Sequence, residues 1–502
     1  MAAATTVTTL RYFSDIASAL GHGGALKGLD NQLTRVDGGA PQTILLVGSD
    51  LRPEVKRQSD FRGLSDTTML LRIDPDRRVL GLLSFPRDLK VSIPGYGTGK
   101  LNEAYAYGGP KLTLKTIQEL TRSPRLPNGL VVNHLVNVDF EGFARAVNAI
   151  DCVFVDVDHR YYHSNAETTD DYEEINLQPG YQPLCGFNAL DFARYRHTDN
   201  DLVRAARQQD LLREARQRIP PERLFEDRRE LVEIFTKHTT SDIDNVDDMV
   251  QLLKLMVEAR DVPLVQTEFN AAVGPSFVTA TDGQIDEAVD RFLGLKDRPA
   301  TIPAKPARNA RAKAKGKAAA KGRSKSKGAG KGGGSKPNYG SLAGNSLTPT
   351  SYGRSLAPGL SARTPSGLLT IYYPTLLETG SDFAQKPRGY LMKHTNRESP
   401  PRNERAAYKW VFFRPGLNEY YGFQGTAWKH PPILENPTDR RRFGDREYLL
   451  FASRTGLRLV GWKTDEGSFW LSNTLRGALS AREMIEIARG MREYSPQPKR
   501  KK

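Results

Sequence analysis

The sequence has no run of about 18 apolar residues, which is the length that a membrane-crossing helix requires. No basic and apolar leader of the kind that directs secretion follows Met1. Cysteine is almost absent, because only Cys152 and Cys185 occur among 502 residues. This count allows at most one disulfide, and the spacing alone leaves open whether the two thiols pair or stay unpaired and buried.

Acidic residues are missing from positions 301–345, which contain twelve Lys and Arg residues. Four more basic residues end the chain at 499–502. The formal net charge is +15, so the rest of the chain, without these sixteen charges, is near −1. The sequence pI of about 9.6 therefore describes a linker and a tail, and it does not indicate a basic DNA-binding domain.

Residues 298–345 are rich in Lys, Ala, Gly and Ser and offer no apolar face that could offset the entropy of ordering. We predict a disordered basic linker. Its composition is similar to that of a linker-histone tail, which leaves a nucleic-acid role open. We favour a flexible, self-repelling linker without specific nucleic-acid binding, attracted loosely to anionic polymers or lipid headgroups.

Apolar patterns divide the rest of the chain, which is long enough for two or three domains. Runs at 44–47, 69–73, 79–85 and 153–157 predict strands, and Asp74-Pro75-Asp76 predicts a turn. Phe140 begins a predicted helix with one apolar face. We therefore predict an α/β fold for residues 42–297, with helices on both faces of a mixed sheet. A helix-rich segment over 222–295 is expected to pack against this domain, with apolar residues at helical spacing at Met249, Leu252, Leu253 and Met256. Within it, a strand at 277–279 and a helix at 284–293 are expected to close the domain.

A smaller C-terminal α+β domain is predicted at 346–492, followed by a basic tail at 493–502. It holds all four tryptophans, and strand-like runs recur at 368–373, 408–413, 420–428, 448–452, 457–462 and 468–471. Ser480 and Glu483 form a capping box at the start of a final helix. We predict a mostly antiparallel sheet packed by that helix, and we interpret the aromatic residues as core rather than as a binding surface.

Four arginines lie close together at Arg194, Arg196, Arg204 and Arg207. We expect the first two on an extended strand end, where alternation points both side chains the same way, and the others in the first turns of the next helix. A helix N-terminus favours anions, and arginine adds bidentate recognition of phosphate. The stretch predicts a phosphate or pyrophosphate site; the alternative is a solvated helix start paired with Asp199 and Asp201.

Further motifs precede this stretch, and with it they resemble, in order, those of the LytR-CpsA-Psr family over about residues 42–220. The motifs are Gly48-Ser49-Asp50, Ser65-Asp66-Thr67, Phe85-Pro86-Arg87-Asp88, Lys100-Leu101-Asn102-Glu103-Ala104-Tyr105, and Arg194-Tyr195-Arg196-His197 with Arg204 and Arg207-Gln208-Gln209. The resemblance implies an enzyme that moves a glycopolymer from a polyprenyl-pyrophosphate carrier onto cell-wall peptidoglycan. It also implies that residues 42–297 are the catalytic domain and that 346–492 is a C-terminal extension of the actinobacterial type.

The same resemblance assigns roles to individual residues. Asp50 and Asp66 are the expected ligands of Mg²⁺ (or Mn²⁺), a hard ion that favours carboxylates and phosphate oxygens. Arg87, Arg194, Arg196 and Arg204 are expected to clamp the phosphates, where fixed positive charge stabilises the transition state. The residues expected to support substrate binding are Lys100, Arg207 and Gln208.

Other roles stay open at the level of sequence. The nucleophile is expected to be a hydroxyl of the acceptor glycan, which needs no Ser/His/Asp triad. His197 is either a base or a structural hydrogen-bonding residue, and Asp199 or Asp201 either activates the acceptor or caps the helix. An apolar tunnel for the isoprenoid tail has candidates that would be core residues in any case: Phe140, Phe143, Val136, Val147 and Leu190.

The chain also departs from the family pattern. Leu64 stands where an arginine usually precedes the Ser-Asp pair, and the nearest arginine is Arg62. The usual N-terminal membrane helix is not in the sequence, so we expect a truncated or misassigned start, or else a soluble paralogue. Residues 1–41 are expected to be a juxtamembrane helix, over 10–33, and a loop. The family's place outside the cytoplasmic membrane favours a disulfide between Cys152 and Cys185.

Three functions compete on these grounds. The first is metal-assisted transfer of the glycopolymer at the membrane surface. The second is hydrolysis of the polyprenyl pyrophosphate by the same site, with water as acceptor. The third is a non-catalytic, lipid-binding regulatory wall protein, for which Leu64 leaves some room.

Overall fold

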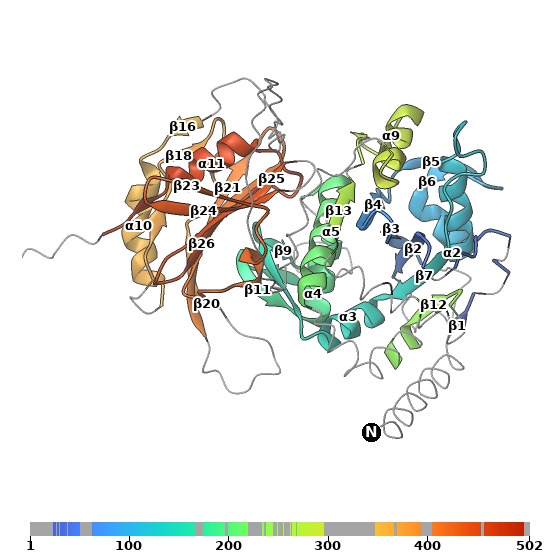
Figure 1. Cartoon of the computed structure of the whole chain (residues 1–502), viewed down its shortest axis with the longest axis horizontal. Coiled ribbons are helices and arrows are strands. Elements are labelled where there is room, and N and C mark those ends of the chain that lie inside the picture. The colour runs from blue at the N-terminus through green and yellow to red at the C-terminus, as the bar shows by residue number, and fades with distance from the viewer. Residues whose placement is uncertain are drawn as a thin grey trace, which may run out of the picture.

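A seven-stranded mixed sheet forms the centre of residues 24–295 in the computed structural model (Figure 1). Its strands, in spatial order, are β1 (Gly24–Ala25), β12 (Thr239–Ser241), β7 (His134–Asp139), β2 (Gln42–Ser49), β3 (Ser65–Asp74), β4 (Val79–Phe85) and β13 (Leu264–Thr267). β3 runs antiparallel to β2 and β4, whereas β7 is parallel to β2 and β13 is parallel to β4.

The structure describes residues 24–295 and 347–495 with gaps. The gaps are at 27, 30, 38, 51–62, 166–173, 196–198, 219–232, 235–236, 244–247, 249–250, 252–254, 256–261, 263, 268, 366–368, 393–403 and 453–455. The predicted linker 298–345 lies outside the described residues, as do most of the basic tail and Met249, Leu252, Leu253 and Met256.

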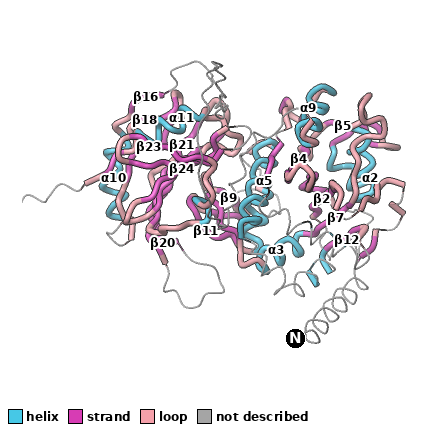
Figure 2. Tube along the Cα trace, in the orientation of Figure 1, coloured by secondary structure: helices cyan, strands magenta, loops and turns pink. Residues whose placement is uncertain are grey.

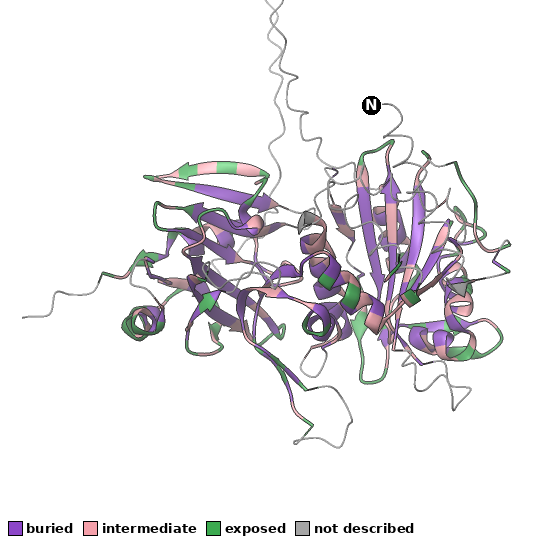
Figure 3. Cartoon of the chain, turned by 90° about the horizontal axis from the view of Figure 1, so that it is seen from below, coloured by how far each residue is buried: buried purple, intermediate pink, exposed green. Residues whose placement is uncertain are grey.

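Helices cover both faces of this sheet, as the apolar patterns predicted (Figure 3). Leu45, Leu70 and Leu83 share a buried core with α2 (Leu101–Leu120) and α9 (Asp282–Phe292). Side chains alternate along a strand, so Ser84 faces the other way. Its hydroxyl accepts a hydrogen bond from Gln209 of α5 (Asp201–Arg218) at 3.0 Å. Beside α5 lies α4 (Gly186–Arg194), and α3 (Phe140–Ala149) packs against α4.

Short antiparallel strand pairs complete this part of the chain. They are β5 (Lys90–Ile93) with β6 (Gly97–Lys100), β8 (Val153–Val157) with β11 (Gly180–Leu184), β9 (Tyr161–His163) with β10 (Ile175–Leu177), and β14 (Ala272–Val273) with β15 (Val278–Thr279). None of the helices in the described part of the chain combines the length and apolar character needed to cross a membrane.

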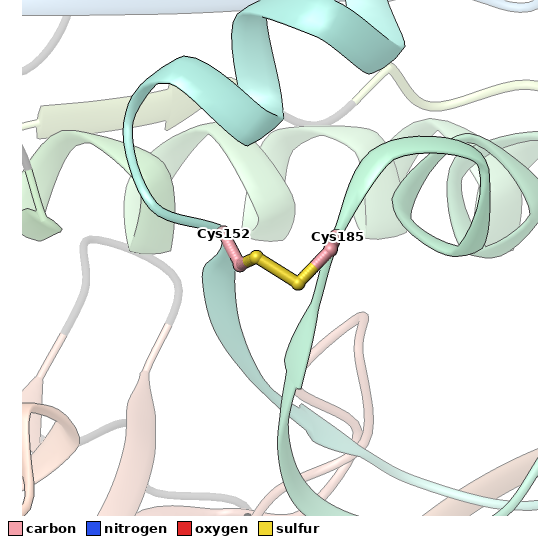
Figure 4. Close-up of a disulfide and its surroundings, with 2 residues drawn as sticks. All are labelled: Cys152 and Cys185. Atoms are coloured by element: carbon pink, nitrogen blue, oxygen red, sulfur yellow. A yellow bond between two sulfur atoms is a disulfide. The ribbon is translucent and has the colours of Figure 1, made fainter. Parts of the chain in front are cut away.

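A disulfide joins Cys152, just before β8, to Cys185, just before α4 (Figure 4). The two Cα atoms are 4.5 Å apart, and the loop that the bond closes has a sequence separation of 33 residues. Since α3 ends at Ala149 and α4 begins at Gly186, the bond fixes the end of one helix near the start of the other. Of the two alternatives for the thiols, the structure therefore shows the paired one.

Strands dominate the C-terminal part of the chain (Figure 2). Its main sheet consists, in order, of β19 (Asp382–Phe383), β21 (Arg405–Arg414), β22 (Glu419–Thr426), β26 (Ser468–Ser472), β25 (Leu457–Lys463), β24 (Arg446–Ala452) and β23 (Asp439–Phe443), with β20 (Arg388–Met392) also paired to β21. The remaining elements are β16 (Leu347–Pro349), α10 (Tyr352–Arg363), β17 (Tyr372–Tyr373), β18 (Leu376–Glu378), η3 (Pro432–Leu434), α11 (Ala481–Arg489) and β27 (Arg492–Glu493).

One face of this sheet packs against α11, which places Met484 and Ile487 beside Trp410 and Trp462 in a common core. The predicted capping box at the start of α11 is present, because Ser480 and Glu483 exchange side-chain and backbone hydrogen bonds. Trp410, Trp462 and Trp470 have no exposed surface, so three of the four tryptophans are core residues.

The other face of the C-terminal sheet packs on the first part of the chain. Phe154 of β8 and Tyr181 of β11 share a buried cluster with Trp470. Inside this contact, Lys409 Nζ and an oxygen of Asp156 in β8 lie 2.6 Å apart, with 1% and 7% of the side chains exposed. Asp156 also accepts hydrogen bonds from the indole of Trp470 and the hydroxyl of Ser472. The two parts of the chain thus share one interior.

Some sequence expectations need correction. Gly24 and Ala25 form a strand, and a turn follows at 31–33, so the helix expected over 10–33 is wrong from Gly24 onward; residues 1–23 lie outside the described residues. β16, β18, β19, β20, α10 and β23 were not predicted as separate elements, whereas β17 lies within the strand predicted over 368–373. β23 and the shorter strands among these carry polar or mixed residues, and α10 contains Pro358, so neither the strand nor the helix pattern is clear there.

Candidate functional site

Three strand ends meet at one edge of the seven-stranded sheet. Asp50 directly follows β2, Asp66 is the second residue of β3, and Arg87 lies two residues after β4. Because β3 is antiparallel to both neighbours, its first residues lie beside the last residues of β2 and β4. Apolar strands that end in charged residues therefore bring two carboxylates and a guanidinium together at this edge.

The Asp66 carboxylate lies between two arginines. Arg87 Nη1 is 2.7 Å from one oxygen, and Arg194 Nε is 3.2 Å from the other. All three side chains are between 11% and 14% exposed. Burial alone would raise the pKa of Asp66, but the charges of Arg194, Arg204 and Arg87 outweigh it and hold the pKa below its ordinary value. Asp66 is thus an ionised carboxylate in a basic environment.

A second row of ion pairs lies beside the first. Arg204 pairs with Asp201 at 2.6 Å, and the other oxygen of Asp201 accepts the backbone N–H of Asp88 at 3.0 Å. Asp88 in turn pairs with Lys100 at 3.1 Å. The pairing of α5 with the segment after β4 spans 113 residues of sequence. Lys100 is therefore in the cluster, as the resemblance implied, through a partner that sequence analysis had not singled out.

Asp50 has a different environment from Asp66. One of its oxygens accepts the backbone N–H of Leu64 at 2.8 Å, and its own N–H donates to the Leu64 carbonyl at 3.3 Å. Burial raises the pKa of Asp50, and the negative charge of Asp66 adds to this shift. Residue 64 contacts Asp50 through its backbone, so this contact does not depend on the change from arginine to Leu64. Arg62 lies outside the described residues.

Arg194 is in the cluster, but the element predicted for it was wrong. It is the last residue of helix α4 and not the end of a strand. Its guanidinium lies over the ring of Phe140 at 3.9 Å, a cation–π contact that fixes the side chain while its Nε contacts Asp66. Phe140, a candidate for the lipid tunnel, thus supports the arginine. Arg196 and His197 lie outside the described residues.

The structure places Arg207, which was expected to support substrate binding, in the interior between α4 and α5. Its side chain has no exposed surface. The guanidinium donates to the carbonyls of Phe192 and Tyr195 at 2.9 and 2.8 Å and pairs with Asp199. Through the Nη1 contacts with Phe192 and Tyr195, Arg207 ties the end of α4 to α5.

Gln208 contacts the elements that carry the cluster. Its amide donates to the Thr67 hydroxyl at 2.9 Å and to the Ala193 carbonyl at 3.2 Å, which ties β3 to the end of α4. It therefore positions the two elements that carry Asp66 and Arg194. Asp199 and Asp201 are both engaged in ion pairs, and the first turn of α5 is capped by Asn200, whose side chain accepts the N–H groups of Leu202 and Val203.

Sequence analysis missed the role of Asp88 as a partner of the cations, whereas the alternative that it left open, pairing of the arginines with Asp199 and Asp201, is present here as buried pairs. A weak local signal exists for Asp201, because it precedes Arg204 by three positions on a helix, where such pairs meet. Except for its neighbour Arg87, the partners of Asp88 are distant in sequence, so no local pattern predicts the role of Asp88. The part of the cluster that the structure describes contains four cations and four carboxylates: Arg87, Lys100, Arg194, Arg204, Asp50, Asp66, Asp88 and Asp201.

The carboxylates of the cluster suit a divalent cation whose remaining ligands come from the substrate. In the described residues, no three His, Cys, Asp or Glu side chains gather into a group that could hold a metal. Asp50 and Asp66 are two carboxylates close enough for the charge of one to raise the pKa of the other. Mg²⁺ is commonly bound by one or two carboxylates together with substrate phosphates. The residues present therefore fit such an ion only with phosphate oxygens as the remaining ligands.

The chain is similar in sequence to known proteins. The model of the LytR_cpsA_psr family matches residues 14–284 of the chain. Over 170 residues, the chain is 34% identical to the polyisoprenyl-teichoic acid–peptidoglycan teichoic acid transferase TagT of Bacillus subtilis, a match that covers 34% of this chain and 50% of the relative. Over 199 residues it is 32% identical to the probable cell wall biosynthesis protein LcpB of Corynebacterium glutamicum, covering 36% and 44%.

The chain thus spans about half the length of the curated relatives it matches. Among solved structures, it is similar to the LytR-CPS2A-psr family protein YwtF (TagT) with bound octaprenyl pyrophosphate lipid. That similarity has a TM-score of 0.38 at 22% sequence identity and covers 54% of this chain and 98% of the other.

Proposed function

Because the chain belongs to the LytR-CpsA-Psr family, we propose that it transfers a glycopolymer from a polyprenyl-pyrophosphate carrier onto cell-wall peptidoglycan. The observation that carries this proposal is the carboxylate of Asp66 held between Arg87 and Arg194, with Arg204 close enough to lower its pKa. The names of the relatives, a teichoic acid transferase and a cell wall biosynthesis protein, support it.

In the proposed reaction, an acceptor hydroxyl attacks the phosphorus that carries the glycan. A new P–O bond forms, the P–O bond to the bridging oxygen breaks, and polyprenyl phosphate leaves. Negative charge grows on the leaving phosphate, and Arg87, Arg194 and Arg204 would stabilise it as fixed, partly desolvated donors. The ring of Phe140 and the ion pairs with Asp66 and Asp201 hold these arginines in place before substrate binds.

The charge balance supports a divalent cation in this reaction. Among the residues that the structure describes, four cations and four carboxylates leave the cluster without net charge, so a pyrophosphate would bring further negative charge to a partly buried site. We propose that Asp50 and Asp66 hold Mg²⁺ or Mn²⁺ together with the phosphates. When bound, the ion supplies positive charge that polarises the phosphoryl oxygens.

We also propose that the protein works at the outer face of the bacterial cell membrane. The disulfide between Cys152 and Cys185 supports this location, because disulfides persist in oxidising compartments. The substrate and the acceptor named for its relatives are both components of the cell wall.

A transfer assay tests the proposal. The chain is incubated with a radiolabelled, lipid-linked phosphoglycan and purified peptidoglycan, with Mg²⁺ or with EDTA, and label in the insoluble wall fraction is counted. Mg²⁺-dependent transfer supports the proposal. Release of label into water at the same rate without an acceptor would instead indicate a polyprenyl-pyrophosphate pyrophosphatase. Binding of the lipid without turnover would indicate a regulatory wall protein.

A further inference from the structure

The C-terminal sheet carries a second concentration of positive charge, apart from the cluster at Asp66. A groove of about 1060 Å³ opens between the β23–β24 hairpin, the end of β25 and the end of α11. Six cations line this basic groove: Arg440, Arg442, Arg446, Lys463, Arg489 and Arg492. Only three carboxylates join them, those of Asp445, Glu447 and Glu486.

Two of the cations are fixed by aromatic rings. The guanidinium carbon of Arg446 lies 4.7 Å from the ring centre of Trp462 and 4.9 Å from that of Tyr372. Arg489 lies 4.9 Å from the ring of Phe443. The N–H groups of a guanidinium point outward in its own plane, so a guanidinium stacked on a ring can still donate them to an anion. The arginines on the wall of the groove are therefore held in place for binding hydrogen-bond acceptors.

The cations of the groove differ in whether a carboxylate pairs with them. Arg440 pairs with Glu447 and Arg489 with Glu486. By contrast, within the part of the chain that the structure describes, neither Arg442 nor Arg492 has an ion pair with a carboxylate, although both are exposed on the groove. Positive charge concentrated on a solvated surface raises the local concentration of anions and of anionic polymers.

From this geometry we infer that the basic groove binds a phosphate-bearing glycopolymer along its chain. Arginine forks recognise phosphate oxygens, and the carboxylates of Asp445, Glu447 and Glu486 can accept hydrogen bonds from sugar hydroxyls. The open groove suits an extended polymer better than a small enclosed ligand. Anion binding follows from the groove alone, whereas the choice of a wall glycopolymer rests on the proposed function.

The aromatic residues argue against single-stranded nucleic acid. Proteins that bind it without sequence preference stack bases on accessible aromatic rings. Beneath the groove, Trp462 and Tyr372 are 0% and 4% exposed, and Tyr448, which lines it, is 3% exposed. Phe443, the other aromatic residue of the lining, is partly exposed, and the guanidinium of Arg489 lies 4.9 Å from its ring. Little aromatic surface is therefore available for stacking bases.

Binding of a lipid-free polymer to the full chain tests the inference. The probe is fluorescently labelled poly(glycerol phosphate), followed by anisotropy at about 0.15 M salt, where exposed charges more than about 8 Å apart are largely screened. Dextran of equal length and a single-stranded oligonucleotide of equal charge are the comparison probes. Two double variants are compared, R442Q/R492Q in the groove and R354Q/R482Q on exposed positions of α10 and α11 outside it.

We expect wild type to bind the phosphate polymer and not dextran. The groove variant should lose about tenfold in affinity, because two charge-assisted contacts are removed, and the control variant should lose less than about twofold. Thermal unfolding of both variants should match wild type, since all four side chains are exposed. R442K/R492K should retain most of the affinity.

Three results would overturn the inference. Equal losses in the two variants would mean diffuse attraction to the net charge of the chain. No binding by wild type would mean that the groove is not a polymer site. Stronger binding of the oligonucleotide, lost in the groove variant, would assign the groove to nucleic acid. The measurement uses no lipid carrier and no turnover, so its outcome is independent of whether the transfer assay succeeds.

Discussion

Arg87 and Arg194 contact opposite oxygens of Asp66, so this carboxylate holds both guanidinium groups at the place where we propose that a phosphate binds. Replacing Arg87 or Arg194 by alanine should reduce turnover by about 10²- to 10³-fold, the usual loss when one preorganised donor to a transition state is removed. Initial rates of glycan transfer measure this effect. Arg145→Ala is the control, because Arg145 is 57% exposed and pairs only with Glu141 in the described structure. Full activity of both site variants would refute the assignment.

The two carboxylates of the site should have opposite effects on stability. The pKa of Asp66 is lowered, so its charge stabilises the fold above its unfolded value of 3.8, and this contribution is lost as the pH falls through the folded value. The pKa of Asp50 is raised, so its contribution is present in acid and is lost as the pH rises from 3.8 through the folded value.

At pH 7 in EDTA, Asp66→Asn should therefore lower the free energy of unfolding by about 1–3 kcal/mol, since Arg87 and Arg194 lose a charged partner. Asp50→Asn should raise it, because asparagine can still accept the N–H of Leu64 without a buried charge. Urea unfolding of the two variants and of wild type measures both effects. A destabilised Asp50→Asn protein would show that its charge stabilises the fold.

At the scale of elements, the disulfide acts on the helices that carry the site. Cys152 and Cys185 tie the end of α3 to the start of α4, while Arg194 at the end of α4 lies over Phe140 at the start of α3. One helix pair is therefore fixed at both ends, covalently at one and by a cation–π contact at the other.

Replacing both cysteines by alanine should cost about 3–4 kcal/mol of stability, as loop entropy predicts for this separation. The variant should also transfer glycan more slowly at a temperature where it remains folded, because α4 positions Arg194. Guanidinium unfolding with and without a reducing agent measures the first effect, and reduction should not destabilise the alanine variant. If reduction leaves wild type equally stable, the bond does not contribute.

The sequence predicts elements that are set by local residue patterns and fails where contacts between distant residues decide. β2, β3 and β4 are apolar runs that end in charged residues, so the meeting of Asp50, Asp66 and Arg87 could be expected. Helix α4 was misread at its end because it is buried on several sides, and its continuous run of buried residues from Ala189 to Ala193 hides the helical period. The pairing of Asp201 with the backbone of Asp88 is a long-range contact that no local pattern contains.

At the scale of the whole molecule, the buried pair of Asp156 and Lys409 joins residues 253 positions apart. The sequence gives no sign of this contact, because both partners are ordinary charged residues in strands. Composition predicted two domains separated by a linker, but it could not predict that they share an interior.

Lys409→Met should destabilise the protein by about 3–5 kcal/mol, because Asp156 would remain buried without its cation. Combining it with Asp156→Asn should recover part of the loss, since the amide leaves no unpaired charge. Thermal and urea unfolding measure the coupling. Arg440→Met is a matched control in the same sheet, because its pair with Glu447 is about half exposed and should be worth less than about 1 kcal/mol. Equal losses from Lys409→Met and Arg440→Met would mean that the buried pair is not coupled to the fold.

We predict that the shared interior holds the two parts of the chain together without a covalent connection between them. Phe154 and Tyr181 on one side and Trp470 and Lys409 on the other form an interface of the kind that separate subunits use. The chain could then be cut within 298–345 and the halves produced from two genes. Co-expressed fragments 1–320 and 321–502 should copurify as a one-to-one complex that unfolds in a single transition. Lys409→Met in the second fragment should abolish this complementation, whereas Arg440→Met should not.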